Sequence, residues 1–408
     1  MLTAQYDMEP LLNSYHLGLT TIFDELNDRV MLIVKAPKEM ILAAKINGGF
    51  DIFIVPPDNK KIHIATLCSA FPEAPGSPIV IVTPMFNSNL SLGILKLLKS
   101  KKFTVHFFDE NNRELLGYEC QHEYSKYGKD ALETLTLVER DLSLLNFTIN
   151  DIDPEKIQKN GINNFIAIKF GKPTMPDDFV RIDTMFSSNN YHGALNSEVG
   201  LGGGGVSRLI VDEPGAYQER DIALILERVF HGGEIYLNPH NDKLKEREEI
   251  TDVMVAYGDS VLLIQAKDSP NTQKIINNKL ERKINTSKKH FDKATAQMQG
   301  AIKYFNNGGV THFYIGEKRH SLNTDGKSFF GLIVLKEIFI EHRKAFSSKV
   351  LMLSDITDVP CLFIEYGDLH SITFNSIKQP GFFFDIIRGM HKHGVDTGLI
   401  PKPRFLNN

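Results

Sequence analysis

Two apolar stretches joined by only two residues constrain the fold of this chain more than any other feature of its sequence. Residues 250–257 and 260–267 are each as long as a typical strand and rich in aliphatic side chains, and only Gly258 and Asp259 separate them. A two-residue connection with glycine at its first position is typical of a type II′ β-hairpin turn. The sequence therefore predicts an antiparallel hairpin here.

The predicted hairpin carries three polar residues on one face. If Tyr257 pairs with Ser260, Asp252 lies directly opposite Gln265. Lys267 follows on the same face, because side chains alternate along a strand with a period of two. A carboxylate, an amide and an ammonium on an otherwise apolar sheet indicate a functional site, since buried charges need partners or a metal. The alternative is a solvated pair at the strand ends, which would contribute little to stability.

Helices and further strands are predicted around this hairpin. A helix over residues 221–230 and a short strand at 234–237 precede it. After it, Phe291, Ala294, Met298, Ala301 and Phe305 form one apolar stripe of a helix over residues 287–305. We expect the later segments to extend and cover the sheet. These are strands at residues 311–315, 329–335, 349–353 and 361–366 and a helix at 382–390.

In this order of elements, Ile250-Thr251-Asp252 and Ile264-Gln265-Ala266-Lys267-Asp268 resemble the motif of the PD-(D/E)XK nuclease superfamily, nearest to its Mrr-like branch with a D…QxK active-site variant. The resemblance covers residues 206–306 well and 307–395 loosely. It implies an α/β fold over residues 206–395, a restriction-endonuclease-like mixed sheet flanked by helices. Thr251 replaces the name-giving proline, and Gln265 replaces an acidic residue with a weaker ligand for a hard cation.

The resemblance also implies roles for individual residues. Asp252 would bind Mg²⁺ or Mn²⁺, and Gln265 would add an oxygen ligand or orient the metal-bound water. Lys267 would stabilise the attacking hydroxide or the charge that builds on the phosphate. A glutamate from the preceding helix often completes the metal site, and Glu219 is expected in that place, with Glu227 as the alternative. Either could instead be a surface glutamate, which at the start of a helix also favours the helix dipole.

A basic stretch follows the motif. Seven lysines and arginines against two acidic residues occupy positions 274–293. We predict that Arg282, Lys283, Lys288 and Lys289 contact nucleic-acid phosphates. The resemblance also implies that Gln297 lies near the substrate or the metal. The alternatives are a solvated helix face and a glutamine at the edge of the core. The net charge of −4 excludes only a basic coat over the whole protein.

Residues 1–195 are predicted to form a separate α+β domain in which no catalytic constellation stands out. Glycine-rich residues 200–205 mark its boundary as a flexible linker, because no Gly-Lys-Ser/Thr follows them as a phosphate loop requires. We expect this domain to act in sensing, specificity or assembly. Its predicted strands are at residues 30–34, 50–55, 61–67, 79–82, 103–108 and 165–170, with a helix at 90–98.

The cysteine count and the apolar runs indicate where the protein works. Its three cysteines lie far apart, which excludes a zinc site built from cysteines and indicates a reducing compartment. The sequence shows no signal peptide and no apolar run as long as a membrane span. We therefore expect a cytoplasmic protein with no membrane partner.

The resemblance implies a Mg²⁺-dependent endonuclease, and we expect it to cut DNA in preference to RNA. The resemblance implies a role in restriction or anti-phage defence, and nucleases that cut both strands often dimerise, so a homo-oligomer is expected. One rival is a catalytically inactive nuclease-fold protein that binds nucleic acid or assists assembly, favoured by Gln265 and disfavoured by Lys267. Another places the activity in the N-terminal domain. Two weaker candidates are the HNH-like run Asn238-Pro239-His240-Asn241 and the pair His391 and His393.

Overall fold

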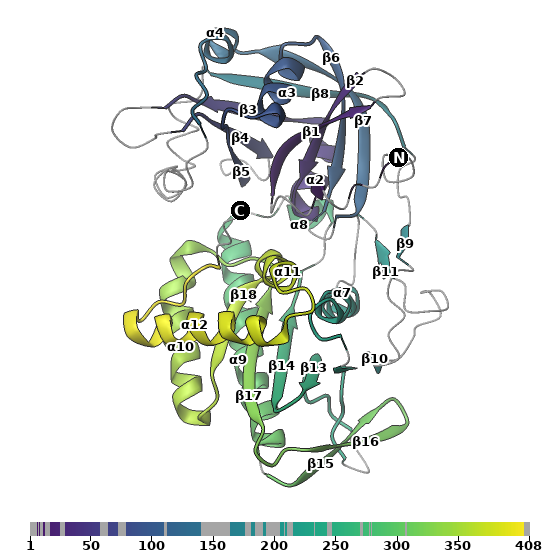
Figure 1. Ribbon diagram of the computed structural model, residues 1–408, viewed down its shortest axis with the longest axis vertical. Helices are drawn as coiled ribbons and strands as arrows, with labels where there is room; N and C mark the ends of the chain where they lie inside the picture. The colour runs from purple at the N-terminus through teal and green to yellow at the C-terminus, as the bar shows by residue number, and fades with distance from the viewer. Residues whose placement is uncertain are drawn as a thin grey trace.

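The computed structural model is built around two β-sheets, which lie in its upper and lower parts in Figure 1. It describes residues 6, 8, 11–12, 17–24, 29–57, 64–71, 79–109, 112–139, 164–175, 181–183, 191–192, 205–207, 209, 215–231, 233–242, 247–269, 272–276, 278, 280–306 and 308–403. Most of the predicted linker and Lys279 lie outside these ranges. Among the described helices, none is both long and apolar enough to cross a membrane.

The first sheet has eight strands, and among its described pairings only that of β2 with β6 is parallel. In sheet order the strands are β1 (Gly18–Asp24), β2 (Arg29–Lys35), β6 (Lys102–Phe108), β7 (Glu114–Tyr124), β8 (Phe165–Pro173), β3 (Gly49–Val55), β4 (Thr66–Phe71) and β5 (Ile79–Pro84). Its helices are α2 (Lys38–Asn47), α3 (Asn89–Leu98) and α4 (Gly128–Glu133). The strand predicted at residues 61–67 lies later in the chain, as β4. Strands β1 and β7 were not predicted from the sequence.

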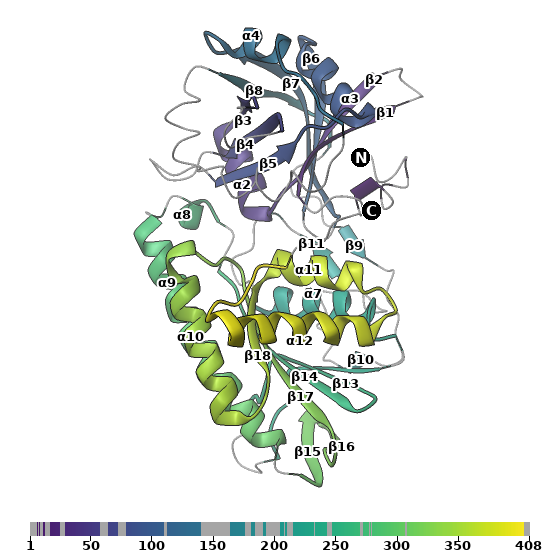
Figure 2. The ribbon, with the colours of Figure 1, turned by 60° about the vertical axis from the view of Figure 1, so that its left-hand side comes forward.

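The second sheet is mixed and has helices on both faces, as the sequence predicts. Its strands, in order, are β10 (Tyr191–His192), β12 (Glu234–Leu237), β13 (Val253–Tyr257), β14 (Ser260–Lys267), β17 (Ser328–Leu335) and β18 (Cys361–Glu365). Figure 2 shows α9 (Leu280–Phe305) and α10 (Ile340–Thr357) on one side of this sheet. The other side carries α7 (Gly215–Glu227), α11 (Tyr366–Asn375) and α12 (Pro380–Thr397).

The predicted hairpin has the predicted register. Tyr257 pairs with Ser260 and Val253 with Ile264, so the two-residue turn fixes every pair between them. Gly258 has φ +52°, the left-handed value that a type II′ turn requires at its first central position. Both faces of the hairpin are covered, and four consecutive residues of β14, from Val261 to Ile264, have no exposed surface. Polar side chains on this hairpin are therefore in a buried environment.

Several predicted elements differ from the structure. The strand predicted over residues 250–257 begins only at Val253, as β13, so Asp252 lies just before it. Residues 349–353, predicted as a strand, lie in α10, where Phe346, Val350 and Leu353 are buried at helical spacing. The strand predicted at 311–315 does not extend the second sheet, because β15 (Val310–Ile315) pairs with β16 (Lys318–Asn323) in a separate ribbon. The helix predicted over residues 221–230 begins earlier, as α7.

The chain crosses between the two sheets near the predicted domain boundary. Strand β10 pairs in parallel with β12 of the second sheet although it precedes residue 195. Two further short strands, β9 (Arg181–Asp183) and β11 (Gly205–Ser207), pair with each other. Leu209, beyond the boundary, packs in the core of the first sheet. The division at residues 195 and 206 remains a prediction.

Candidate active site

Asp252 and Lys267 meet at one end of the second sheet. The backbone N–H of Asp252 donates to Ile264 O over 3.1 Å, although Ile264 is already the partner of Val253, so the regular ladder ends at the first residue of β13. Lys267 Nζ lies 3.2 Å from Asp252 Oδ2, and the Ala266 N–H donates to the same oxygen over 2.5 Å. Asp252 is only 2% exposed. The solvated surface pair is therefore excluded, and Asp252 and Lys267 lie together as predicted.

Glu219 joins this pair from helix α7. Its side chain accepts a hydrogen bond from Asn238 Nδ2 over 3.1 Å, and it interacts electrostatically with Asp252 and Lys267. Burial, with the nearby charge of Asp252 as the next cause, raises the pKa of Glu219 to about 7. Glu227, the alternative, ends the same helix about two turns away. The structure thus brings Glu219, the expected glutamate, to the motif.

A third carboxylate, that of Glu249, belongs to the cluster and was not predicted. Its side chain shares a hydrogen bond with Asp252, and it interacts with Glu219 and Lys267. Burial, followed by the bond to Asp252, raises the pKa of Glu249 above its ordinary value. The segment that carries Glu249 is held by a β-bridge to His240, which bridges in turn to Tyr314 of β15. Three carboxylates therefore surround one ammonium.

Gln265 and Asn238 contribute amide oxygens whose hydrogen-bonding capacity is unused. Gln265 Nε2 donates to Ile250 O over 3.3 Å, which directs the amide, while its Oε1 is buried and accepts nothing from any described residue. Asn238 Oδ1 is in the same situation. Asn238 reaches the cluster because its backbone, at φ +50°, turns directly after β12 and its N–H donates to Asp252 O over 2.9 Å. Unsatisfied buried oxygens of this kind are free to accept a hydrogen bond from water or to coordinate a cation.

These oxygens fit a hard divalent cation by their chemistry. Carboxylates and amide carbonyls are the ligands that Mg²⁺ and Mn²⁺ prefer, and a cation would relieve the crowding that raises the pKa of Glu219 and Glu249. Among the described residues, however, no three histidine, cysteine, aspartate or glutamate side chains are close enough together to bind one ion as they are now oriented. The candidate ligands would have to reorient, and Lys267 would have to share Asp252 with the metal.

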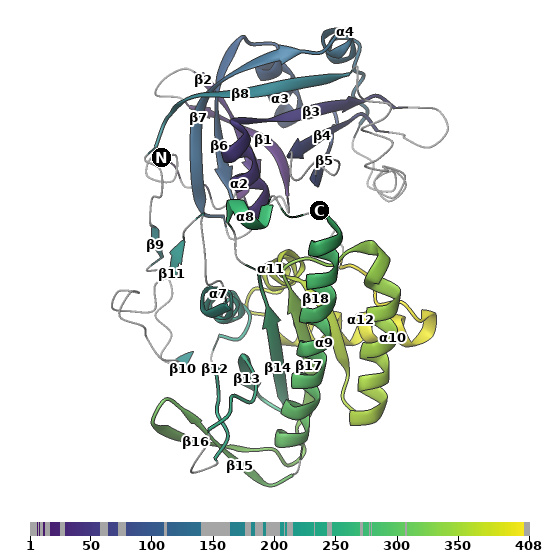
Figure 3. The same cartoon turned by 180° about the vertical axis from the view of Figure 1, so that it is seen from behind.

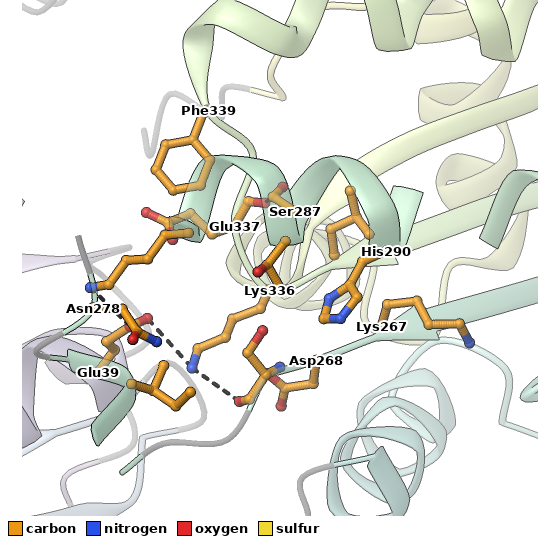
Figure 4. Close-up of a pocket in the computed structure, with 14 residues that line it drawn as sticks. Glu39, Lys267, Asp268, Asn278, Ser287, His290, Lys336, Glu337 and Phe339 are labelled. Carbon is orange, nitrogen blue, oxygen red and sulfur yellow. Dashed lines mark hydrogen bonds and ion pairs between the residues drawn. The ribbon is translucent and has the colours of Figure 1, made fainter. Parts of the chain in front are cut away.

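A cavity of about 160 Å³ adjoins Lys267 (Figure 4). It is lined by Asp268, directly after β14, by His290 of α9, and by Glu39 from α2 of the first half. Burial raises the pKa of Asp268, although Lys336 partly offsets it, and burial together with Lys267 lowers the pKa of His290. His290, which the sequence did not single out, is thus kept neutral beside the candidate site.

The predicted nucleic-acid contacts lie in different surroundings along α9. Arg282, Lys288 and Lys289 are exposed, as a phosphate contact requires. Lys283 is instead 8% exposed, and its ammonium lies 3.7 Å from a carboxylate oxygen of Glu39. Gln297 is half-buried, and its Oε1 accepts no hydrogen bond within the described part of the chain. Their role in binding remains a prediction.

Comparison with known proteins finds a distant structural similarity and no matching family. No protein-family model matches the chain, and no curated protein matches it. Among solved structures, it is similar to the small subunit of the heterodimeric restriction endonuclease R.BspD6I, with a TM-score of 0.26 and 10% sequence identity over 44% of this chain and 80% of that one. A similarity of this size carries no argument, so the function rests on the chain's own side chains.

Proposed function

We propose that this chain is a metal-dependent nuclease that hydrolyses phosphodiester bonds of nucleic acid, DNA in preference to RNA. The observation that carries the proposal is the buried contact of Lys267 with Asp252, 3.2 Å apart, inside a cluster of carboxylates at the strand ends. An ammonium held among hard oxygen ligands suits a reaction in which negative charge builds on a phosphate.

The chain's own residues divide the chemistry between them. Lys267 can stabilise charge on a phosphoryl oxygen, because its ammonium is 16% exposed and within reach of an incoming group. Glu219, whose pKa is about 7 in the metal-free site, can release its proton near neutral pH as the cation binds. Asp252, Glu219 and Gln265 would hold Mg²⁺ or Mn²⁺, with Glu249 as a further ligand. The bound cation would lower the pKa of water and neutralise phosphate charge.

One observation favours an inactive nucleic-acid-binding or assembly protein as the second candidate. Gln265 stands where an anionic ligand would be expected, and its amide nitrogen is engaged by Ile250 O over 3.3 Å. A site with one carboxylate fewer binds a divalent cation more weakly. This candidate predicts retention of nucleic acid without cleavage.

Cleavage assays with purified full-length protein test the proposal. Plasmid, single-stranded DNA and RNA are incubated with Mg²⁺, Mn²⁺ or EDTA, and the wild type is compared with Lys267→Met and Asp252→Asn. We expect metal-dependent cleavage of DNA that falls by about 10²-fold or more in each variant, because each removes a group that acts on the developing charge. Lys344→Met is the matched control, since it removes one exposed lysine on α10.

The outcomes separate the two candidates. Cleavage that survives in both active-site variants would refute the assignment of the site. Retention of DNA in a mobility-shift assay, with no cleavage under any metal, would replace the nuclease with the binding protein. Preference for RNA over DNA would correct the substrate. A role in restriction or anti-phage defence and a homo-oligomeric state remain expectations from the resemblance.

A further inference from the structure

A turn of the first sheet reaches the helix that carries Glu219. Arg113 follows the β6–β7 turn, and its guanidinium donates two parallel hydrogen bonds to Asp221 of α7, each 2.9 Å long. Both side chains are buried, at 5% and 9% exposure. Figures 1 and 3 show α7 below the lower end of β7. A bidentate, buried pair of this kind fixes orientation as well as distance.

Further charges make this contact a network. Lys38 of the first half lies 3.6 Å from Asp109 and 4.0 Å from Asp221. The backbone N–H of Arg113 donates to Asp109 Oδ1 over 2.9 Å, which anchors the turn itself. Burial alone would raise the pKa of Asp221, but Arg113 and Lys38 outweigh it and hold that pKa below its ordinary value. Asp221 is therefore ionised, chiefly because of Arg113 and Lys38 of the first half, with a hydrogen bond to Tyr366 as a further cause.

The position of Asp221 on α7 gives the contact its significance. Glu219 and Asp221 are two residues apart, so they project about 200° apart around the helix axis. The first half therefore holds α7 from the side opposite the candidate site. Between the two lies Arg220, itself only 9% exposed, and Ile222 beyond them is fully buried in the core of the second sheet. A displacement of the helix at Asp221 would be passed directly to the Glu219 carboxylate.

The first half touches the second at another place, which offers a comparison. Glu39 of α2 lies 3.4 Å from Lys336 and 3.7 Å from Lys283, on the cavity beside α9 (Figure 4). This contact also joins opposite charges, yet it involves α9 and Lys336, directly after β17, rather than α7. Removing it should disturb the cavity and leave α7 in place.

We infer that Arg113 is a positioning residue: through Asp221, the β6–β7 hairpin fixes α7 and thereby the place where Glu219 meets Asp252 and Lys267. This gives residues 1–195 a defined task, which is to hold the active site together from outside. Because β6 and β7 are interior strands of the first sheet, anything that bends that sheet changes the geometry of the site. The consequence for catalysis rests on the proposed function, whereas the coupling itself does not.

Hydrogen exchange followed by mass spectrometry tests the coupling in the full-length chain. The variants are Arg113→Gln, Asp221→Asn, the double variant, and Glu39→Gln as the matched control. We expect amide exchange over residues 215–227 to accelerate by about tenfold or more in each single variant. The double variant should be no faster than either single one, because both remove the same interaction. Glu39→Gln should leave α7 at the wild-type rate.

Kinetics then test the consequence. Arg113→Gln should lower kcat and leave KM unchanged, and Arg113→Lys should restore part of kcat, because lysine keeps the charge and loses the two-pronged geometry. Wild-type exchange rates over α7 in Arg113→Gln would overturn the coupling, and so would an equal acceleration across both sheets. If the wild type cleaves nothing, the proposed function fails while the exchange rates still decide the coupling.

Discussion

Replacement of Glu219 by glutamine should stabilise the metal-free protein above neutral pH. Burial and the neighbouring Asp252 raise the pKa of Glu219 from its ordinary value of 4.5 to about 7. Ionisation of this side chain therefore lowers the stability of the folded protein. Glutamine has the same shape, carries no charge, and keeps an oxygen that can accept the hydrogen bond from Asn238. The variant thus removes the charge and little else.

The size of the effect follows from proton linkage. A carboxyl with a pKa of about 7 when folded and 4.5 when unfolded lowers stability by at most about 3 kcal/mol, at about 1.4 kcal/mol for each unit of difference. Below pH 4.5 both states are protonated and the cost is absent. It grows as the pH rises toward 7, because the unfolded chain ionises first, and it is complete above 7. Partial solvent access makes this value an upper bound.

Urea unfolding followed by circular dichroism measures this difference. Wild type and Glu219→Gln are compared in EDTA at several pH values between 5 and 8, and the gap in unfolding free energy should widen from about 1 to about 3 kcal/mol over that range. With Mg²⁺ present, the gap in unfolding free energy should narrow, or the wild type should become the more stable protein. The reason is that the ionised wild-type side chain can bind the cation, whereas glutamine binds it less well. A gap in EDTA that does not change with pH would refute the buried, destabilised carboxyl.

Three further predictions concern the site and the core. Gln265→Glu should tighten Mg²⁺ binding in isothermal titration calorimetry, because a carboxylate is a stronger ligand for a hard cation; unchanged or weaker binding would remove Gln265 from the metal site. Gly331→Ala should lower the free energy of unfolding by about 1–3 kcal/mol, since the new Cβ would lie 2.7 Å from Cys361 Sγ, whereas Gly300→Ala, with open space around it on α9, should be neutral or stabilising by up to about 1 kcal/mol. Leu262→Ala should cost about 2–5 kcal/mol in chemical denaturation, because Leu262 has no exposed surface; a loss below 1 kcal/mol in that assay, about the cost of a single methylene, would contradict its place in the core.

The part of the site that the sequence predicts correctly is the part set by local geometry. A two-residue turn fixes the register from Tyr257 and Ser260 as far as Val253 and Ile264, and Asp252, the next residue, contacts Lys267. The helical stripe of α9 is equally local. Its five predicted core residues, from Phe291 to Phe305, are all essentially buried, because spacing alone decides which face of a helix is apolar.

The parts of the structure that the sequence does not predict depend on contacts between segments far apart in the chain. Arg113 and Asp221 are 108 residues apart, and no spacing rule connects them. Glu249 lies in a charged loop whose path is set by β-bridges through His240. No sequence pattern therefore predicts its contact with Asp252. The error at residues 349–353 has another origin. A short apolar run suits a strand and a buried helix equally, and only the neighbouring Phe346 reveals the helical period.

The small strand β10 has a practical consequence for cutting this chain into pieces. It forms the outermost strand of the second sheet and pairs in parallel with β12 through Tyr191 and His192. A fragment that starts at residue 206 would leave the backbone groups along β12 open to solvent. Open strand edges recruit other strands, so such a fragment should self-associate through β12. Truncations meant to isolate the second half should therefore begin before residue 191.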